Sequence, residues 1–196
     1  MNNLFFNVTC AIVGSSSEIL EHSNGILIDK HDIVIRSNYA PTYMYEKYVG
    51  NKTDAIVVPY HMYKKGKCKK YNFYSCDSHF AYPACLRFRS QCSNSYLINP
   101  SFSLSIRNIV GEKMPNRPTT GFTSIFLANS LCREIKLFGF GETLKFNYSK
   151  YYDKTKKKYI KYPHDYYSEK RIIKNKYFKV IEKNYSKVVT PIITKN

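Results

Sequence analysis

Four short runs of apolar and β-branched residues recur along the chain, and their order constrains the fold more than any other feature. The runs are Cys10–Val13, Ile33–Arg36, Ala55–Val58 and Ile135–Phe138. Runs of this length, bounded by Gly, Ser and Asn, are typical of buried β-strands. The stretches Ser15–His22 and Thr120–Cys132 have hydroxyl caps, and the second also has helical apolar spacing. Strands that alternate with helices predict an α/β fold, with helices flanking a mostly parallel central sheet.

The length of the chain suits one domain. With 196 residues, a single core can bury about 70% of the surface that the unfolded chain exposes. No linker or internal repeat divides the sequence, so we expect one domain over residues 1–196. Within it we expect a variable insertion over 64–92, which is irregular and cysteine-rich, and a basic, mobile loop over 143–161.

The sequence carries no pattern typical of membrane insertion. No apolar run approaches the roughly 18 residues that a spanning helix needs. The first residues, Met1–Asn7, have neither a basic start nor a long apolar stretch. From the sequence we therefore expect no anchor or signal peptide in this chain.

The cysteines do not reveal their own pairing. Six are present, and none forms a Cys-x-x-Cys pair of the kind found in zinc ribbons and thioredoxin-like proteins. Six cysteines allow many pairings, and spacing alone does not choose among them.

Positive charge is concentrated in the last quarter of the chain. The whole sequence has 31 Lys and Arg against 14 Asp and Glu, a formal charge of +17. From Lys145 onward there are 15 Lys and Arg against 4 Asp and Glu. An exposed loop explains adjacent lysines, since like charges cannot all be buried. Interleaved tyrosines leave open a second interpretation, a nucleic-acid-binding module in which the rings stack on bases.

The first strand ends in a turn that is suited to anions. Gly14, Ser15 and Ser16 follow Cys10–Val13, and free backbone N–H groups at such a helix start can bind phosphate. A simple tight turn is the alternative, and this motif alone does not decide. The same block continues to Ile28–Pro41, which includes Asn38, and then to 49–53.

A second block opens the helix predicted over Thr120–Cys132. Thr119, Thr120 and Gly121 place two hydroxyls and a glycine at its start, which makes another anion-receptive N-terminus. An ordinary helix cap is the alternative. This block extends to Leu137–Gly141.

A third block is His164–Glu169, preceded by Tyr151–Asp153. A histidine with acidic neighbours can serve as a general base, because its pKa lies near about 6.5 and a carboxylate can orient the ring. A structural or solvated histidine is the alternative.

Together and in this order, the three blocks resemble the large, small and very small sialylmotifs of the eukaryotic-type sialyltransferases, glycosyltransferase family 29. The resemblance spans roughly Cys10 to Glu169 and is closest to plant and algal members. It implies a Rossmann-like variant of the glycosyltransferase A fold that uses a CMP-activated sugar and no metal or other cofactor. The sequence has no Asp-x-Asp pair, the usual carboxylates for a nucleotide-bound divalent ion.

The resemblance also assigns roles to residues. It implies that His164 is the catalytic base, that Glu169 is a supporting residue, and that Cys10 and Cys132 form a disulfide. The residues that it places at the donor nucleotide are Gly14, Ser15, Asn38, Thr119, Thr120, Gly121, Lys150 and Tyr151. Ser15 stands where relatives usually have Asn, and Lys150 where they have His or Tyr, so either Lys150 or Tyr151 is expected to steady the departing phosphate.

The implied reaction is the transfer of sialic acid from CMP-sialic acid, with inversion, to a hydroxyl of an acceptor glycan on a glycoprotein or glycolipid. Family resemblance implies the Golgi lumen or secretory pathway, whereas the absence of a visible anchor leaves a soluble or cytoplasmic protein open. Two alternatives also remain: a transferase for another CMP-activated acidic sugar such as CMP-Kdo, and a catalytically silent homologue that binds CMP or glycans.

Overall fold

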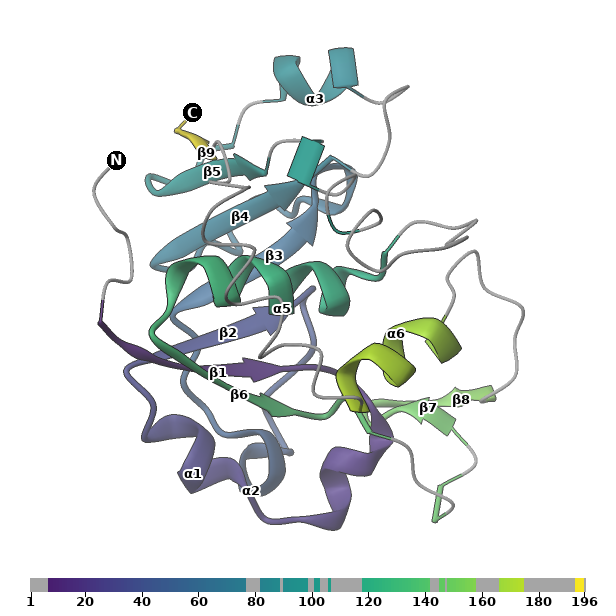
Figure 1. Cartoon of the computed structure of the whole chain (residues 1–196). Helices are drawn as coiled ribbons and strands as arrows, with labels where there is room; N and C mark the ends of the chain where they lie inside the picture. The colour runs from purple at the N-terminus through teal and green to yellow at the C-terminus, as the bar shows by residue number, and fades with distance from the viewer. Residues whose placement is uncertain are drawn as a thin grey trace.

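The computed structural model is built on one sheet of seven strands in the order β6-β1-β2-β3-β4-β5-β9 (Figure 1). It describes residues 7–76, 82–88, 90–98, 101–102, 106, 118–141, 145–146, 148–157, 166–174 and 193–195. The strands of the sheet are β1 (Thr9–Val13), β2 (Ile33–Ser37), β3 (Ala55–Pro59), β4 (Tyr71–Ser75), β5 (Ser95–Ile98), β6 (Glu134–Phe138) and β9 (Ile193–Lys195).

The first six strands run parallel, and β9 pairs antiparallel to β5. The four strands predicted from apolar runs are β1, β2, β3 and β6, so the expected mostly parallel α/β sheet is confirmed. Because β1 pairs with β2 on one side and with β6 on the other, the order of strands reverses beside β1. In open α/β sheets, ligands bind at the carboxyl ends of the strands at such a reversal.

The segment 64–92, which we expected to be an insertion, supplies a central strand. β4 lies within it and pairs with β3 and β5. Four of its five residues are buried, although its sequence is Tyr-Asn-Phe-Tyr-Ser. Asn72 is tolerated there because its side chain exchanges hydrogen bonds of 2.8 and 2.9 Å with the backbone of Lys69. A search for apolar runs misses such a strand, since its polar groups are satisfied locally.

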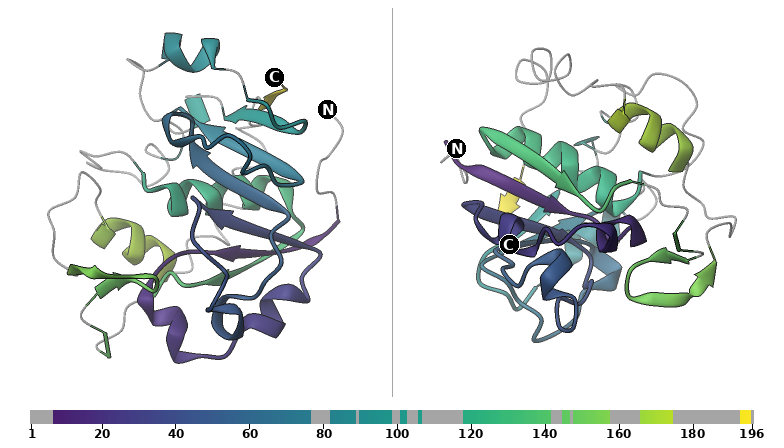
Figure 2. Two further views of the ribbon diagram at one scale, coloured as in Figure 1. Left: turned by 180° about the vertical axis from the view of Figure 1, so that it is seen from behind. Right: turned by 90° about the horizontal axis from the view of Figure 1, so that it is seen from below.

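Helices cover both faces of the sheet (Figure 2). On one face α5 (Thr120–Leu131) packs on β1, β2, β3 and β6, which confirms the helix predicted over Thr120–Cys132. On the other face lie α1 (Gly25–Asp29) and α2 (Glu46–Val49). None of the described helices is long and apolar enough to span a bilayer.

The predicted helix over Ser15–His22 is a shorter element. The structure has a 3₁₀ helix, η1 (Ser17–Glu21), with Ser16 as its N-cap. The Ser16 hydroxyl accepts a hydrogen bond from the Glu18 amide, and extended backbone at His22 ends the element. The prediction was therefore right about the cap but wrong about the length and the helix type. The remaining described helices are η2 (Tyr60–Met62), α3 (Tyr82–Arg87) and α6 (Tyr166–Lys174).

Part of the basic segment 143–161 forms a hairpin rather than the expected mobile loop. Its strands β7 (Tyr148–Lys150) and β8 (Asp153–Lys157) pair antiparallel. β7 docks on η1, because the Ser17 hydroxyl donates to the Tyr148 carbonyl at 2.7 Å. Backbone pairing and this contact order a stretch whose charge pattern alone predicts a loop.

Disulfides hold the sheet at several points. Cys10 pairs with Cys132, as the resemblance implies, and joins β1 to the end of α5 across 122 residues. Closing a loop of that length stabilises a fold by roughly 2–4 kcal/mol. Two further bridges, Cys68–Cys92 and Cys76–Cys85, join segments that flank β4.

Candidate active site

Hydrogen bonds join the segments that follow β1 and β6, at the point where the order of the strands reverses. The Gly14 amide donates to the Phe138 carbonyl at 2.8 Å, and the Ser16 amide donates to the Gly139 carbonyl at 3.0 Å. The Ser16 hydroxyl donates to the Gly141 carbonyl at 2.8 Å. A Cβ atom on Gly14 would collide with the Gly139 carbonyl oxygen, so only glycine fits at this crossing.

A buried chain of hydroxyls ties the end of β2 to the start of α5. The Ser124 hydroxyl donates to the Thr120 carbonyl at 2.7 Å, and the Ser37 hydroxyl lies 2.9 Å from that of Ser124. Because Ser124 uses its proton on Thr120, Ser37 is the donor in that pair. This chain fixes Asn38, the next residue after Ser37, relative to the first turn of α5.

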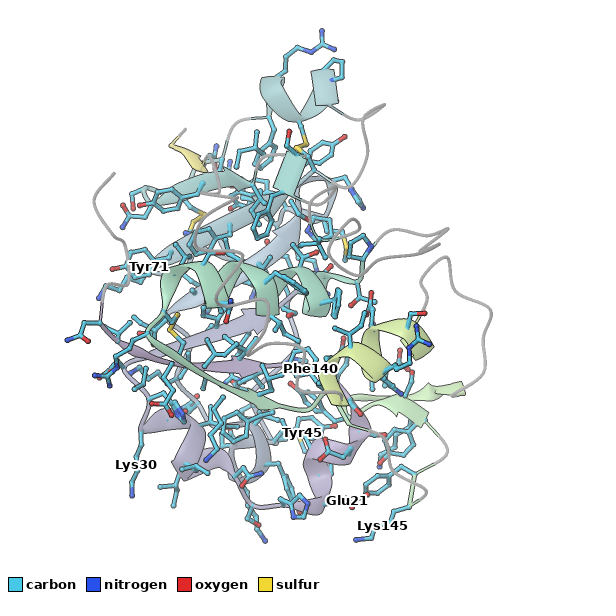
Figure 3. All side chains as sticks on the ribbon, in the orientation of Figure 1. Glu21, Lys30, Tyr45, Tyr71, Phe140 and Lys145 are labelled. Atoms are coloured by element: carbon cyan, nitrogen blue, oxygen red, sulfur yellow. A yellow bond between two sulfur atoms is a disulfide. The ribbon has the colours of Figure 1, made fainter. Side chains whose placement is uncertain are left out.

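Phe140 lies between the two glycine turns of the site. Its ring would come within 3.1 Å of a Cβ atom on Gly14, and within 3.1 Å of one on Gly121. Figure 3 labels Phe140 where β6 ends. Glycine at both positions therefore leaves room for an aromatic ring between the β1 turn and the α5 N-terminus.

Glu169 caps the N-terminus of α5 from a distant part of the chain. Its carboxylate accepts hydrogen bonds from the Thr119 amide at 2.6 Å and the Thr119 hydroxyl at 2.7 Å. The Thr119 hydroxyl in turn accepts from the Phe122 amide at 3.0 Å. Glu169 is only 4% exposed, so these are buried, charge-assisted bonds, which are stronger than bonds between neutral groups. They join α6 to α5.

Tyr151 faces the protein interior. It is fully buried, its amide donates to the Ser15 carbonyl at 3.1 Å, and its hydroxyl donates to the Pro41 carbonyl at 2.5 Å. Burial raises the pKa of this hydroxyl, and the nearby Arg36 guanidinium opposes the shift only in part. Tyr151 is therefore a neutral donor to the backbone, with its proton already used.

Lys150 lies at the surface beside the β1 turn. It is half-buried and forms a β-bridge with Ser16. Its ammonium lies 5.7 Å from the centre of the Tyr152 ring, within range of a cation–π contact. Of the two residues expected at the departing phosphate, only Lys150 carries a charge, and it is half-buried whereas Tyr151 is fully buried.

Asn38 has a buried acceptor without a donor. Its backbone has the left-handed φ of 59°, and its amide donates to the Val57 carbonyl at 2.8 Å. The side-chain oxygen Oδ1 is buried and has no hydrogen-bond partner among the described residues. Such an atom costs free energy unless a ligand or water satisfies it.

Contacts link Ser15 with Tyr151, Ser16 with Lys150, Thr119 with Glu169, and Gly14 with Gly121 across Phe140. The bridge residues Cys10 and Cys132 lie apart from these, where β1 begins and α5 ends. His164 lies outside the described residues. A cavity of about 220 Å³ opens beside Phe140 and Gly141, between η1 and α6. Neither Asn38 nor Thr120 lines it, so it adjoins one side of the cluster only. In the part of the chain that the structure describes, no group of three His, Cys, Asp or Glu side chains is placed to hold a metal ion.

A comparison with family models decides the relationship of this chain. The model of glycosyltransferase family 29 (sialyltransferase) matches residues 7–76 and 63–176. These ranges include all the described helices and strands from β1 to α6. The chain belongs to glycosyltransferase family 29.

Two vertebrate sialyltransferases illustrate what this chain is similar to. The beta-galactoside alpha-2,6-sialyltransferase 2 of Xenopus tropicalis is 31% identical over 160 residues, covering 66% of this chain and 31% of the relative. The CMP-N-acetylneuraminate-beta-galactosamide-alpha-2,3-sialyltransferase 1 of Pan troglodytes is 28% identical over 161 residues, covering 74% and 47%. This family 29 chain thus spans between about a third and a half of these relatives. The expected closeness to plant and algal members finds no support in them.

Solved structures agree with the fold of the family 29 chain. A crystal structure of a mammalian sialyltransferase in complex with Gal-beta-1-3GalNAc-ortho-nitrophenol matches with a TM-score of 0.68 at 23% identity, covering 86% of this chain and 65% of that chain. A second mammalian sialyltransferase structure matches with a TM-score of 0.66 at 24% identity, covering 89% and 67%. The expected Rossmann-like, glycosyltransferase A-type architecture is confirmed.

The sequence analysis missed the place of Phe140 in the site and the partner of Glu169. Phe140 was interpreted only as part of the end of the second block, although an aromatic residue between Gly139 and Gly141 at a strand end is a usable signal. Glu169 was expected to support the site, but its partner Thr119 lies 50 residues away. No spacing rule connects residues that far apart.

Proposed function

We propose that this family 29 chain transfers sialic acid from CMP-sialic acid to a hydroxyl of an acceptor glycan, with inversion and without a metal ion. The observation that carries the proposal is the convergence of β1, β2, α5 and β6 on one edge of the sheet, with the Asn38 oxygen left unpaired there among the described residues. Open α/β sheets bind nucleotides at such an edge.

The nucleotide is held by groups that the fold leaves available. Asn38 Oδ1 accepts a hydrogen bond from a hydroxyl or amino group of the donor. Thr120 and Gly121 contribute backbone N–H groups of the first turn of α5, which can donate to an anion, while the Glu169 carboxylate already offsets part of the helix dipole there. Thr119 lines the same turn, but its hydroxyl and amide are used by Glu169. We therefore assign it to holding the turn rather than to direct nucleotide contact.

Negative charge develops on the CMP phosphate as the bond to the sugar breaks. Lys150, beside Ser15 and Ser16, supplies the cation that meets this charge, together with the α5 N-terminus. Tyr151 does not share this role, since its proton is donated to Pro41. The +17 charge of the chain also steers an anionic donor toward the site.

His164 removes the proton from the acceptor hydroxyl as that oxygen attacks the anomeric carbon. It precedes the first residue of α6, Tyr166, by two positions. The hydrogen bonds that Glu169 accepts from Thr119 anchor α6 against α5, and so fix the start of α6 two residues after His164. Glu169 acts as a positioning residue in this scheme.

The disulfides bear on the cellular compartment in which the proposed enzyme works. Disulfides persist in oxidising compartments and are rare in the cytosol. The three bridges therefore favour the Golgi lumen or another part of the secretory pathway. The acceptors there are glycans on glycoproteins or glycolipids.

A direct test is incubation of the chain with CMP-sialic acid and a panel of β-galactosides, followed by detection of CMP and of sialylated product. We expect product with at least one galactoside, less CMP release from CMP-Kdo, and the same rate with EDTA present. Product only with CMP-Kdo would reassign the donor, and loss of activity in EDTA would refute the metal-free step. Binding of CMP without release from either donor would identify a silent homologue.

A further inference from the structure

The cavity between η1 and α6 contains groups that the proposed donor site does not use. Its volume is about 220 Å³, and its lining comes from η1, Asn24, the end of β6 and α6. Pockets for drug-sized molecules measure roughly 300–1,000 Å³. A cavity of the observed size therefore suits one sugar ring better than a whole nucleotide or an oligosaccharide.

Two polar side chains in this lining have no partner within the part of the chain that the structure describes. The Glu18 carboxylate and the Asn24 side-chain amide take part in no hydrogen bond or ion pair there. Asn24 precedes α1, but its side chain does not cap that helix. A carboxylate accepts hydrogen bonds, and an amide both donates and accepts them. Together the two side chains can bind hydroxyl groups, which also donate and accept.

The rest of the lining supplies apolar surface. Phe140 is half-buried and lines the cavity together with Ile19, Leu137 and Ile173. Figure 3 labels Phe140 beside α6. An aromatic ring offers a broad apolar face, against which the C–H groups of a sugar ring can pack. Apolar surface with a few convergent polar groups is the usual composition of a small-ligand site.

The charge of the lining distinguishes between the two substrates of the proposed reaction. Glu18 contributes one negative charge and Lys170 one positive charge, and these cancel. An anionic CMP-sugar therefore gains no net attraction in the cavity, whereas Lys150 meets its phosphate at the proposed donor site. The cavity favours an uncharged ligand that is rich in hydroxyl groups.

Phe140 places the cavity next to the proposed donor site. Its ring would come within 3.1 Å of Cβ atoms on Gly14 and Gly121, and the same residue lines the cavity. The helix α6, which contributes Lys170 to the lining, begins two residues after His164. A ligand in the cavity thus lies beside the donor turns and against the helix that follows the proposed base.

We propose that this cavity is a subsite for an uncharged sugar ring of the acceptor glycan. Glu18 and Asn24 bind the hydroxyl groups of that ring, and Phe140 packs against its C–H face. This inference rests on the proposed function and adds residues that determine which acceptors the chain binds.

The test measures the affinity of lactose, an uncharged β-galactoside, for CMP-loaded protein by ligand-detected NMR. We expect Glu18→Gln and Asn24→Ala each to weaken lactose binding roughly two- to tenfold. Ile173→Trp fills the cavity and should weaken binding by more than about tenfold. The matched control is Glu134→Gln, which neutralises an exposed carboxylate of β6 outside the cavity and should leave lactose affinity unchanged. CMP affinity should stay the same in all four variants.

Equal lactose affinity in wild type, Glu18→Gln, Asn24→Ala and Ile173→Trp would overturn the inference. So would weaker CMP binding in Glu18→Gln with unchanged lactose binding, which would assign the cavity to the donor. Wild-type protein that releases CMP from CMP-sialic acid but does not bind lactose would overturn the inference and leave the proposed function standing. Wild-type protein that releases no CMP would refute the proposed function, while lactose binding that depends on Glu18 would still support a sugar site in the cavity.

Discussion

Replacing Glu169 by alanine is expected to destabilise the protein and to slow transfer at the same time. The change leaves the Thr119 amide and hydroxyl without their acceptor at a buried helix start. Losing hydrogen bonds to a charged group costs about 1.5–3 kcal/mol each, and we expect a total loss of about 3 kcal/mol. For a chain of this length that lowers Tm by roughly 6–12 °C.

The effect on transfer distinguishes positioning from stability. At a temperature where the variant remains folded, α6 loses its fixed attachment to α5, so we expect kcat to fall much more than the affinity for CMP. Thr119→Val, which removes the hydroxyl without changing the volume, should reproduce part of the loss. Thr119→Ser keeps the hydroxyl and serves as the matched control.

A double-mutant cycle between positions 119 and 169 should give a coupling free energy of about 1–3 kcal/mol. Thermal unfolding and initial rates of CMP release measure both effects. A Glu169→Ala protein with the Tm and kcat of wild type would show that the contact between α5 and α6 has no part in the site.

Replacing His164 by alanine is expected to reduce kcat about 10²–10⁴-fold, the usual contribution of a general base. CMP affinity should stay close to that of wild type, because the base acts on the acceptor. The wild-type rate should fall on the acid side of its pH profile, since a protonated imidazole cannot take the acceptor proton. The rate of His164→Ala should not show this fall at acid pH.

His22→Ala is a suitable control, because His22 is an exposed histidine that follows η1. Rates over a range of about pH 5–9, measured on both variants with the same galactoside, make the comparison. Turnover of His164→Ala within a fewfold of wild type would assign the base to another group.

Local sequence pattern was enough to predict the part of the fold that is apolar and continuous. β1, β2, β3 and β6 were predicted because buried parallel strands need short apolar runs. β4 was not, because its buried Asn72 and Tyr74 break the apolar run, and their partners, the Lys69 backbone and the Ser90 hydroxyl, lie outside the strand. The hairpin of β7 and β8 was missed for a related reason, as its order depends on docking against Ser17.

Sequence pattern likewise predicts some parts of the site and not others. The turns at Gly14 and at Thr119 to Gly121 are local features, so their residue types alone indicate anion binding. The partners that hold those turns come from far along the chain, as with Ser37 and Ser124, which are 87 residues apart. Tyr151 shows the limit most clearly. Its place in the third block suggested a phosphate contact, whereas burial directs its hydroxyl to Pro41.

The central claim is that the edge formed by β1, β2, α5 and β6 holds a cytidine monophosphate. Calorimetric titration of CMP into wild-type protein and into Asn38→Gly tests it most directly, since glycine accepts the φ of 59° and removes only the side chain. We expect saturable binding of one CMP per chain, weakened roughly tenfold in the variant. Absence of CMP binding to wild type, or equal affinity in the two proteins, would contradict the account.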